Sequence, residues 1–121
     1  MTKRPRISII GAGSGQFSMG MVRDLCLTPT LWNSTISFMD ISAERLDAVF
    51  EVATRYTREL SADLRLEKTL DRRESLRDAD FVITTFRVGD MAGRAIDERV
   101  ALDHGVLGQE TTGPGGFAMG L

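Results

Sequence analysis

The chain has 121 residues, of which 42% are hydrophobic and 26% charged, and its formal net charge at pH 7 is −2. This size suits one domain with a single core, and the near-neutral charge argues against nucleic acid as the main partner. No apolar run approaches the roughly 18 residues of a membrane span, and the apolar stretch near the start is too short for a signal peptide. The single cysteine, Cys26, excludes an internal disulfide, so we expect a reducing, cytoplasmic compartment.

Short apolar runs alternate along the chain with segments of helical periodicity. The predicted elements are, in order, a strand at 6–10, a helix at 14–27, a strand at 35–40, a helix at 43–60 capped by Ser42, a strand at 64–69, a short helix at 74–77, a strand at 80–86, a helix at 91–104 and the start of a further helix from 117. This alternation is typical of a doubly wound α/β fold with a parallel sheet.

The last predicted strand, 80–86, is apolar on consecutive residues, which indicates that both of its faces are covered. In the dinucleotide-binding strand order it lies beside the first strand, across the switch point, and needs a fifth strand next to it. The sequence offers no such strand. We therefore expect residues 1–121 to be the first part of a larger protein, with the sheet truncated before its remaining strands.

The segment IIGAGSGQFSMG joins the first strand to the first helix. Gly11 and Gly13 permit a tight turn and a close approach of backbone N–H groups to a pyrophosphate at the positive end of the helix. Asp40 ends the second strand, where it can accept hydrogen bonds from a ribose diol, and its charge favours NAD over NADP. Gln16 replaces the third glycine of G-x-G-x-x-G, and a tight turn without a ligand is the alternative. The predicted cofactor-binding residues are Gly11, Ala12, Gly13, Ser14, Gly15, Gln16, Phe17 and Asp40.

The sequence resembles the amino-terminal part of glycoside hydrolase family 4, the NAD- and metal-dependent glycosidases. The segments that carry the resemblance are ISIIGAGSGQFSMGMVRDLC, MDISAERLDAV, DADFVITTFRVG, RAIDERV and GVLGQETTGPGG, which together extend over essentially the whole chain. The last segment is the most specific, because ordinary dehydrogenases lack it. The resemblance implies that residues 1–121 form a Rossmann-type NAD-binding domain, with a catalytic domain further along.

The resemblance also implies a reaction unlike that of glycosidases with two catalytic carboxylates. In the family, NAD takes a hydride from carbon 3 of the sugar, and a divalent metal, usually manganese, polarises the resulting ketone. A tyrosine removes the proton on carbon 2, the O-glycosidic bond is eliminated, water adds, and the hydride returns. The substrates are small sugar or sugar-phosphate glycosides, and relatives tend to be dimers or tetramers. The chain by itself is expected to be inactive.

Two residues match substrate-site positions of the family. Arg94 matches an arginine that approaches the substrate in phospho-sugar members, and Glu110 matches an acid proposed to protonate the leaving group. The alternatives are that Arg94 pairs with neighbours on its helix and that Glu110 only orders its loop. The glycine-rich run at 113–116 is a plain turn or, as we favour, a close approach of backbone to a ligand.

The metal ligands of the family, a cysteine and a histidine, and its tyrosine base are not matched in this chain. We expect Cys26 to pack in the core, His104 to cap a helix, and Tyr56 to have no catalytic role. Two other functions stay open: an NAD-dependent dehydrogenase of the lactate or malate type, and a stand-alone NAD-binding module.

Overall fold

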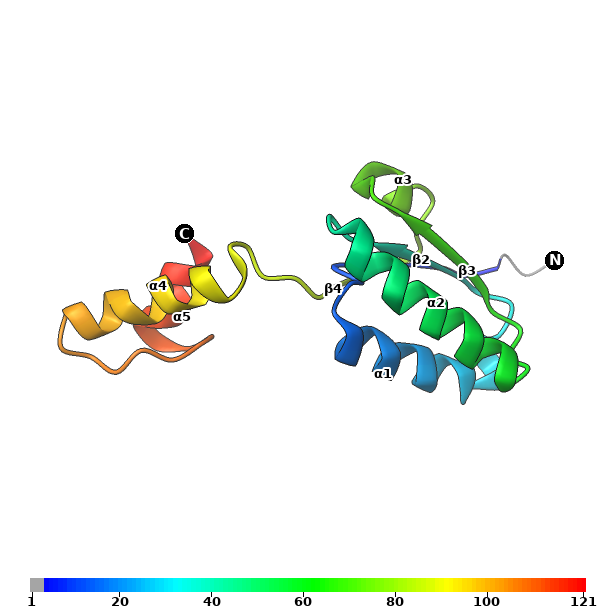
Figure 1. The fold of residues 1–121 in the computed structure, drawn as a ribbon, viewed down its shortest axis with the longest axis horizontal. Helices are drawn as coiled ribbons and strands as arrows, with labels where there is room; N and C mark the ends of the chain where they lie inside the picture. Colours follow the sequence, from blue (N-terminus) through cyan, green and yellow to red (C-terminus); the bar gives the residue numbers. More distant parts are fainter. Residues whose placement is uncertain (1–3) are drawn as a thin grey trace. The chain divides into compact units, whose positions relative to one another are not determined.

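The computed structural model describes residues 4–121, which form two compact units, one that ends at Phe86 and one that comprises Arg87–Leu121 (Figure 1). The first unit contains β1 (Arg6–Ile10), α1 (Gly15–Cys26), the 3-10 helix η1 (Pro29–Leu31), β2 (Thr35–Met39), α2 (Ala43–Glu59), β3 (Arg65–Thr69), α3 (Arg72–Leu76) and β4 (Phe81–Thr84). The second unit contains α4 (Asp90–Asp103) and α5 (Gly113–Gly120). Every predicted helix and strand is present, and most boundaries agree to within two residues.

The four strands form one parallel sheet in the order β3-β2-β1-β4. This order confirms the doubly wound α/β prediction. In that fold β1 lies inside the sheet, with β2 and β3 on one side and β4, the first strand of the second half, on the other. Helices α1 and α2 cover one face of the sheet and α3 the other (Figure 1). The carboxyl ends of β1, β2 and β4 meet at one edge, where α1 begins.

The main core lies between the sheet and the pair α1 and α2. Alternate residues of a strand point to opposite faces, so the strand residues of this core are spaced by two. Its buried members are Ile7, Ile9, Ala12, Val22, Leu25, Cys26, Ile36, Phe38, Leu46, Val49 and Ala53. Phe38 is fully buried and meets Phe50 of α2 edge to face, with ring centroids 5.7 Å apart.

The opposite face of the sheet carries a small polar layer beneath α3. The hydroxyl oxygen of Ser75 lies 2.7 Å from that of Ser8 on β1 and 2.9 Å from that of Ser37 on β2. All three serines are buried. Small side chains let α3 approach the strands closely, and their mutual hydrogen bonds satisfy hydroxyl groups that water cannot reach.

Strand β4 differs from the prediction in its burial. It pairs with β1 on the expected side, but Phe81 is 61% exposed and Val82 50% exposed in this chain. The prediction that both faces of this strand are covered is therefore wrong for the chain described here. The physical reason is that β4 is the edge strand and the helices lie over the other strands: α2 packs on β2 and β3, and α3 packs on β1, β2 and β3.

The second unit pairs two helices that lie side by side (Figure 1). Gly89, in the left-handed conformation with φ of 77°, precedes α4. Helix α5 begins at Gly113, four residues before the predicted start, with Pro114 in its first turn. Proline suits that position, because its φ is preset for a helix and its missing N–H would have no helical partner.

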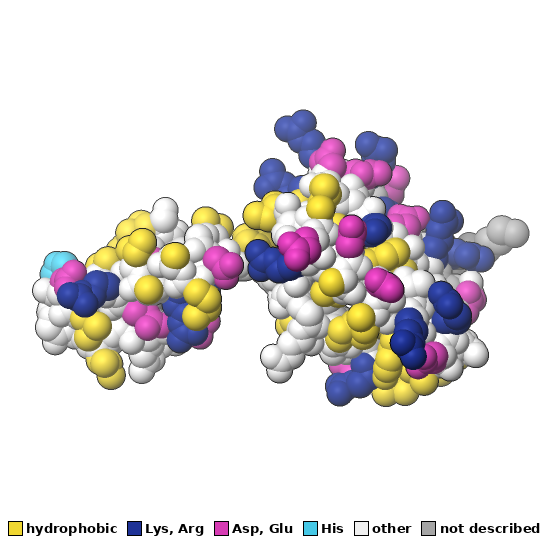
Figure 2. Space-filling view, viewed as in Figure 1, with side chains coloured by type: hydrophobic (Ala, Val, Ile, Leu, Met, Phe, Trp, Pro, Cys, Tyr) yellow, Lys and Arg dark blue, Asp and Glu magenta, His cyan; other side chains and the backbone are white. Residues whose placement is uncertain are grey.

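Within residues 4–121 no helix is long and apolar enough to cross a bilayer. On the face seen in Figure 2, the basic and acidic side chains of each unit are interspersed. That mixture agrees with a net charge close to zero and offers no one-signed surface in this view.

Candidate functional site

The turn between β1 and α1 is built at the carboxyl edge of the sheet. The N–H groups of Gly11 and Ala12 both donate to the Met39 carbonyl, at 2.8 and 2.9 Å. Gly11 has φ of 91°, and a Cβ atom there would collide with the carbonyl oxygen of Thr85, just beyond β4. Only glycine fits this position, because it alone tolerates both the positive φ and the close backbone.

Asp40 joins the glycine turn to the start of α2. Its Oδ2 accepts the N–H of Gly13 at 2.8 Å, and its Oδ1 accepts the N–H of Ser42 at 2.9 Å. A Cβ on Gly13 would lie 2.7 Å from the same Oδ2, so the missing side chain is what lets this hydrogen bond form. An ionised carboxylate has about four acceptor positions, so each oxygen can still accept one hydroxyl. Asp40 thus has a structural role and keeps capacity for a diol.

The N–H groups of this turn divide into two sets. Those of residues 11–14 all donate within the chain, to Met39, to Asp40 and to a carbonyl of the turn itself. The next three N–H groups, at residues 15–17, open α1, where no helical acceptor exists, and they find no partner among residues 4–121. They are exposed, and the hydroxyl of Ser14 makes no capping bond to them.

The free donors belong to the later residues of the predicted set. We predicted that Gly11 and Gly13 let backbone N–H groups approach a pyrophosphate and that residues 11–17 bind the cofactor; the N–H groups of residues 11–14 hold the turn together. The available donors belong to Gly15, Gln16 and Phe17. Three exposed N–H groups at the positive end of a helix, beside a carboxylate with spare acceptor positions, fit the diphosphate and the ribose of a dinucleotide.

The second unit gathers four charged side chains. Glu110 Oε1 accepts a hydrogen bond from Arg87 Nη2 at 2.6 Å, and Glu110 Oε2 lies 3.4 Å from Arg94 Nη1. Arg94 Nε donates to Glu98 Oε1 at 2.7 Å, one turn further along α4. We call these four residues the charged cluster. The contacts that the structural alternatives require are present, since Arg94 pairs along its helix and Glu110 ties its loop to α4.

Arg94 stays charged in this cluster. The hydrogen bond to Glu98 raises the pKa of Arg94, and the negative charges of Glu110 and Glu98 add to that effect. The ordinary pKa of arginine is already far above neutral, so Arg94 carries a permanent positive charge.

A family model described as family 4 glycosyl hydrolase matches residues 6–121. The chain belongs to this family. It is 38% identical over 126 residues to a 6-phospho-beta-glucosidase of Escherichia coli, covering 100% of this chain and 27% of that protein. It is also 39% identical over 123 residues to a maltose-6'-phosphate glucosidase of Bacillus subtilis, covering 98% and 27%. The chain spans about a quarter of the length of these curated relatives.

Solved structures agree with this assignment. The 6-phospho-beta glucosidase of Thermotoga maritima, in a structure with manganese, NAD+ and glucose-6-phosphate, matches with a TM-score of 0.85 and 31% identity over 96% of this chain and 27% of that one. A lactate dehydrogenase from Cryptosporidium parvum reaches a TM-score of 0.57 at 19% identity over 84% of this chain and 33% of that one, and shares the fold alone. The family resemblance is confirmed, and the dehydrogenase alternative is the weaker one.

The glycine-rich segment at 113–116 packs against its own backbone. A Cβ on Gly115 would collide with the carbonyl oxygen of Gln109, and one on Gly116 with that of Thr111. The first turn of α5 thus lies directly on the loop that carries Glu110. The close approach that we expected toward a ligand is, for these two glycines, an approach to the chain itself.

The remaining candidate residues have structural roles. Cys26 is buried in the core, with its Sγ 3.8 Å from Thr57 Oγ1, and Tyr56 is half-buried against the same core. His104 follows α4, where its Nδ1 lies 2.9 Å from the Val100 carbonyl oxygen. Among residues 4–121, no group of three or more His, Cys, Asp or Glu side chains could hold a metal ion. The described residues therefore do not form a manganese site.

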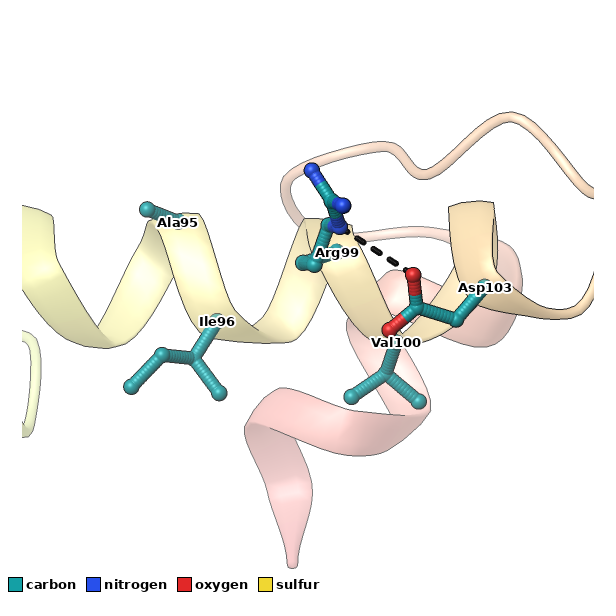
Figure 3. A pocket seen from close by; sticks show the side chains of 5 residues that line it. All are labelled: Ala95, Ile96, Arg99, Val100 and Asp103. Atoms are coloured by element: carbon teal, nitrogen blue, oxygen red, sulfur yellow. Dashed lines mark hydrogen bonds and ion pairs between the residues drawn. The ribbon is translucent and has the colours of Figure 1, made fainter.

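Two shallow hollows in the second unit lie away from this chemistry. One runs along α4, where all of its lining residues come from a single helix (Figure 3). The other is apolar and lies between α4 and α5. Neither contains Glu110 or Arg94, so the sites are defined by donors and charges rather than by enclosed volume.

Proposed function

We propose that the chain is the cofactor-binding part of a cytoplasmic family 4 enzyme of carbohydrate metabolism that hydrolyses 6-phospho-glucosides with NAD and manganese. Its partners are then a small sugar-phosphate substrate and further copies of the same protein, with no role for nucleic acid or membrane. The observation that carries the proposal is the free first turn of α1 beside Asp40. Membership of the family, with relatives named for 6-phospho-glucosides, supports the substrate class.

The cofactor is assigned to the edge of the sheet. The N–H groups of residues 15–17 would bind the diphosphate, with residues 11–14 forming the floor of the crevice. Asp40 would accept the two ribose hydroxyls with its spare acceptor positions. When bound, NAD supplies a hydride acceptor for the sugar. The chain's own contribution is to bind and orient the cofactor.

The sugar phosphate is assigned to the charged cluster. Arg94 would bind an anionic or hydroxyl oxygen of the substrate. Glu110 would accept a hydrogen bond from a sugar hydroxyl, because its ion pairs with Arg87 and Arg94 favour the ionised carboxylate over the proton donor that we expected. No group of three or more His, Cys, Asp or Glu side chains within residues 4–121 could hold manganese, so the metal site is assigned to the remainder of the protein.

The exposed faces of β4 support a further part of the proposal. Phe81 and Val82 are large apolar side chains at the sheet edge, and the relatives are about four times as long as this chain. We assign the covering of this strand to the remainder of the protein, together with the metal ligands, the base and most of the substrate site.

The cofactor assignment is tested by titrating NAD and NADP into Asp40→Asn by calorimetry. We expect NAD binding to weaken by about 1–3 kcal/mol, because the charge-assisted bonds to the ribose are lost. Binding of NADP should weaken less or improve, since a negative charge near its 2′-phosphate is gone. The control is Asp47→Asn on α2, where the carboxylate pairs with Lys68 at 2.7 Å. Equal affinity of the wild type and Asp40→Asn for NAD would refute the ribose role.

The activity is tested on the complete protein with nitrophenyl 6-phospho-glucosides, NAD, manganese and a reductant. We expect release of nitrophenol, and none from residues 1–121 alone. Reduction of NAD with lactate or malate, without glycoside cleavage, would instead support the dehydrogenase alternative.

A further inference from the structure

We propose that Arg45, in the first turn of α2, is a specificity-determining residue of the cofactor site. The charge of Asp40 keeps the 2′-phosphate of NADP out, and where that charge is removed Arg45 binds the phosphate. The proposal rests on the proposed function, because it concerns the same ribose. No role was predicted for Arg45 from the sequence.

Asp40 is held in one orientation toward the crevice. Its Oδ2 accepts the N–H of Gly13 at 2.8 Å and its Oδ1 accepts the N–H of Ser42 at 2.9 Å, so both oxygens are fixed by the backbone. The remaining acceptor positions of the carboxylate are directed away from those two N–H groups. A ribose diol can donate to these positions, whereas a phosphate in the same place would meet a fixed negative charge.

The side chain of Arg45 starts beside the same turn. A Cβ on Gly13 would lie 3.0 Å from the Cβ of Arg45, as well as 2.7 Å from Asp40 Oδ2. The glycine turn, the acid and the first turn of α2 therefore meet at one point. Arg45 is exposed, and its long side chain can bring a guanidinium to a ligand that Asp40 contacts.

The cap of α2 sets the position of the Arg45 backbone. The hydroxyl of Ser42 accepts the N–H of Arg45 at 3.4 Å, and the N–H of Ser42 is itself bound by Asp40. The positive end of the helix attracts an anion, while Glu44 in the same turn repels one, so these two contributions oppose each other. The charge of Arg45 then decides whether a phosphate is held.

The difference between the two cofactors explains this division of roles. NAD carries a hydroxyl at the ribose 2′ position, and NADP carries a phosphate there. A carboxylate accepts a hydrogen bond from the hydroxyl and repels the phosphate, whereas a guanidinium binds phosphate through parallel N–H donors. Removing the charge of Asp40 takes away the repulsion and keeps the arginine. Cofactor preference is thus set by two charged side chains rather than by Asp40 alone.

A matched control lies further along the same helix. Arg55 Nε pairs with Glu59 Oε1 at 2.9 Å, and these side chains are 79% and 61% exposed. Arg55 follows Arg45 by about three turns of helix. Loss of Arg55 removes an equal positive charge from α2 without changing the charge beside Asp40.

The test is a double-mutant cycle in which the complete protein is titrated with NAD and NADP by calorimetry. Asp40→Asn should reduce the preference for NAD over NADP by about tenfold or more, because the repulsion of the 2′-phosphate is gone. Adding Arg45→Gln to Asp40→Asn should weaken NADP binding about tenfold and NAD binding by less than about threefold. Arg45→Lys in the same background should retain part of the NADP affinity and lose it as salt is raised. Arg55→Gln should change neither affinity.

Two outcomes with Arg45→Gln in the Asp40→Asn background overturn the proposal. Equal losses for NAD and NADP would show that Arg45 holds a group common to both cofactors, and an unchanged NADP affinity would show that it holds no phosphate. Thermal melting checks that each variant is folded. Asp40→Ser, whose hydroxyl can accept one of the two N–H groups, replaces Asp40→Asn if that variant is not.

The wild type separates this proposal from the proposed function. A wild-type protein that binds no NAD refutes the cofactor assignment itself. If the wild type binds NAD and Asp40→Asn keeps the same preference for NAD over NADP, the role given to Arg45 fails while the cofactor assignment stands.

Discussion

The two units build their candidate sites from different materials. In the first unit, backbone N–H groups and one carboxylate stand on a sheet in which Ile9, Ile36 and Phe38 are 0% exposed. In the second, charged side chains carry the site, and within residues 87–121 only Ala101 and Gly115 are buried. A site made of backbone depends on the fold that holds it. A site made of long side chains depends on the ion pairs between them.

The largest expected effect is on the free energy of unfolding, and it compares a core residue of the first unit with an exposed residue of the second. Phe38→Ala should lower the free energy of unfolding by about 3–5 kcal/mol, because it leaves a cavity between the sheet and α2. The same change at Phe117, which is 71% exposed on α5, should have an effect within about 0.5 kcal/mol. Urea denaturation of both variants measures the contrast. Similar losses at the two positions would mean that the second unit has a core of its own.

The next effect tests the glycine turn. Gly11→Ala should destabilise the first unit by about 2–4 kcal/mol, because it combines a strained positive φ with a collision against the Thr85 carbonyl. The control is Gly20→Ala inside α1, where a Cβ meets nothing within 4 Å. That change should stabilise by about 0.5–1 kcal/mol, through the higher helix propensity of alanine. A stable Gly11→Ala protein would show that the turn is not fixed by its packing.

The smallest effect is expected in the charged cluster. Glu110→Gln should shift the melting temperature by less than about 2 °C, since ion pairs between partly exposed side chains contribute little to stability. A shift this small would mark the cluster as an arrangement for binding rather than for folding. A shift of many degrees would place Glu110 among the residues that hold the second unit together.

Local pattern was enough to predict most of the fold. Periodicity and turn residues located each α-helix and strand but not the 3-10 helix η1, and the alternation of elements predicted the parallel sheet. The start of α5 was placed too late, because Gly-Pro-Gly-Gly is typical of a turn and only the packing of the loop backbone on Gly115 and Gly116 shows why glycines open a helix there. The exposure of β4 was also missed, since an apolar strand has the same sequence whether or not its neighbours are present.

The candidate sites were predicted in their residues but not in their contacts. Gly11, Gly13 and Asp40 came from a motif, yet hydrogen bonds within the chain decide which N–H groups stay free. The sequence showed only that Arg87 follows a strand. Its pairing with Glu110 could not be predicted, because the two residues lie 23 positions apart. The buried serines at 8, 37 and 75 likewise come together only across the sheet.

The sequence by itself determined the order of elements, the glycine turn, the acid that follows β2 and the family, because each is written in residues close together along the chain. The tertiary structure decided which N–H groups are free at the start of α1, how far each oxygen of Glu110 lies from Arg87 and Arg94, and how the three buried serines meet. Those depend on distances between segments far apart in sequence, and such distances exist only once the chain has folded.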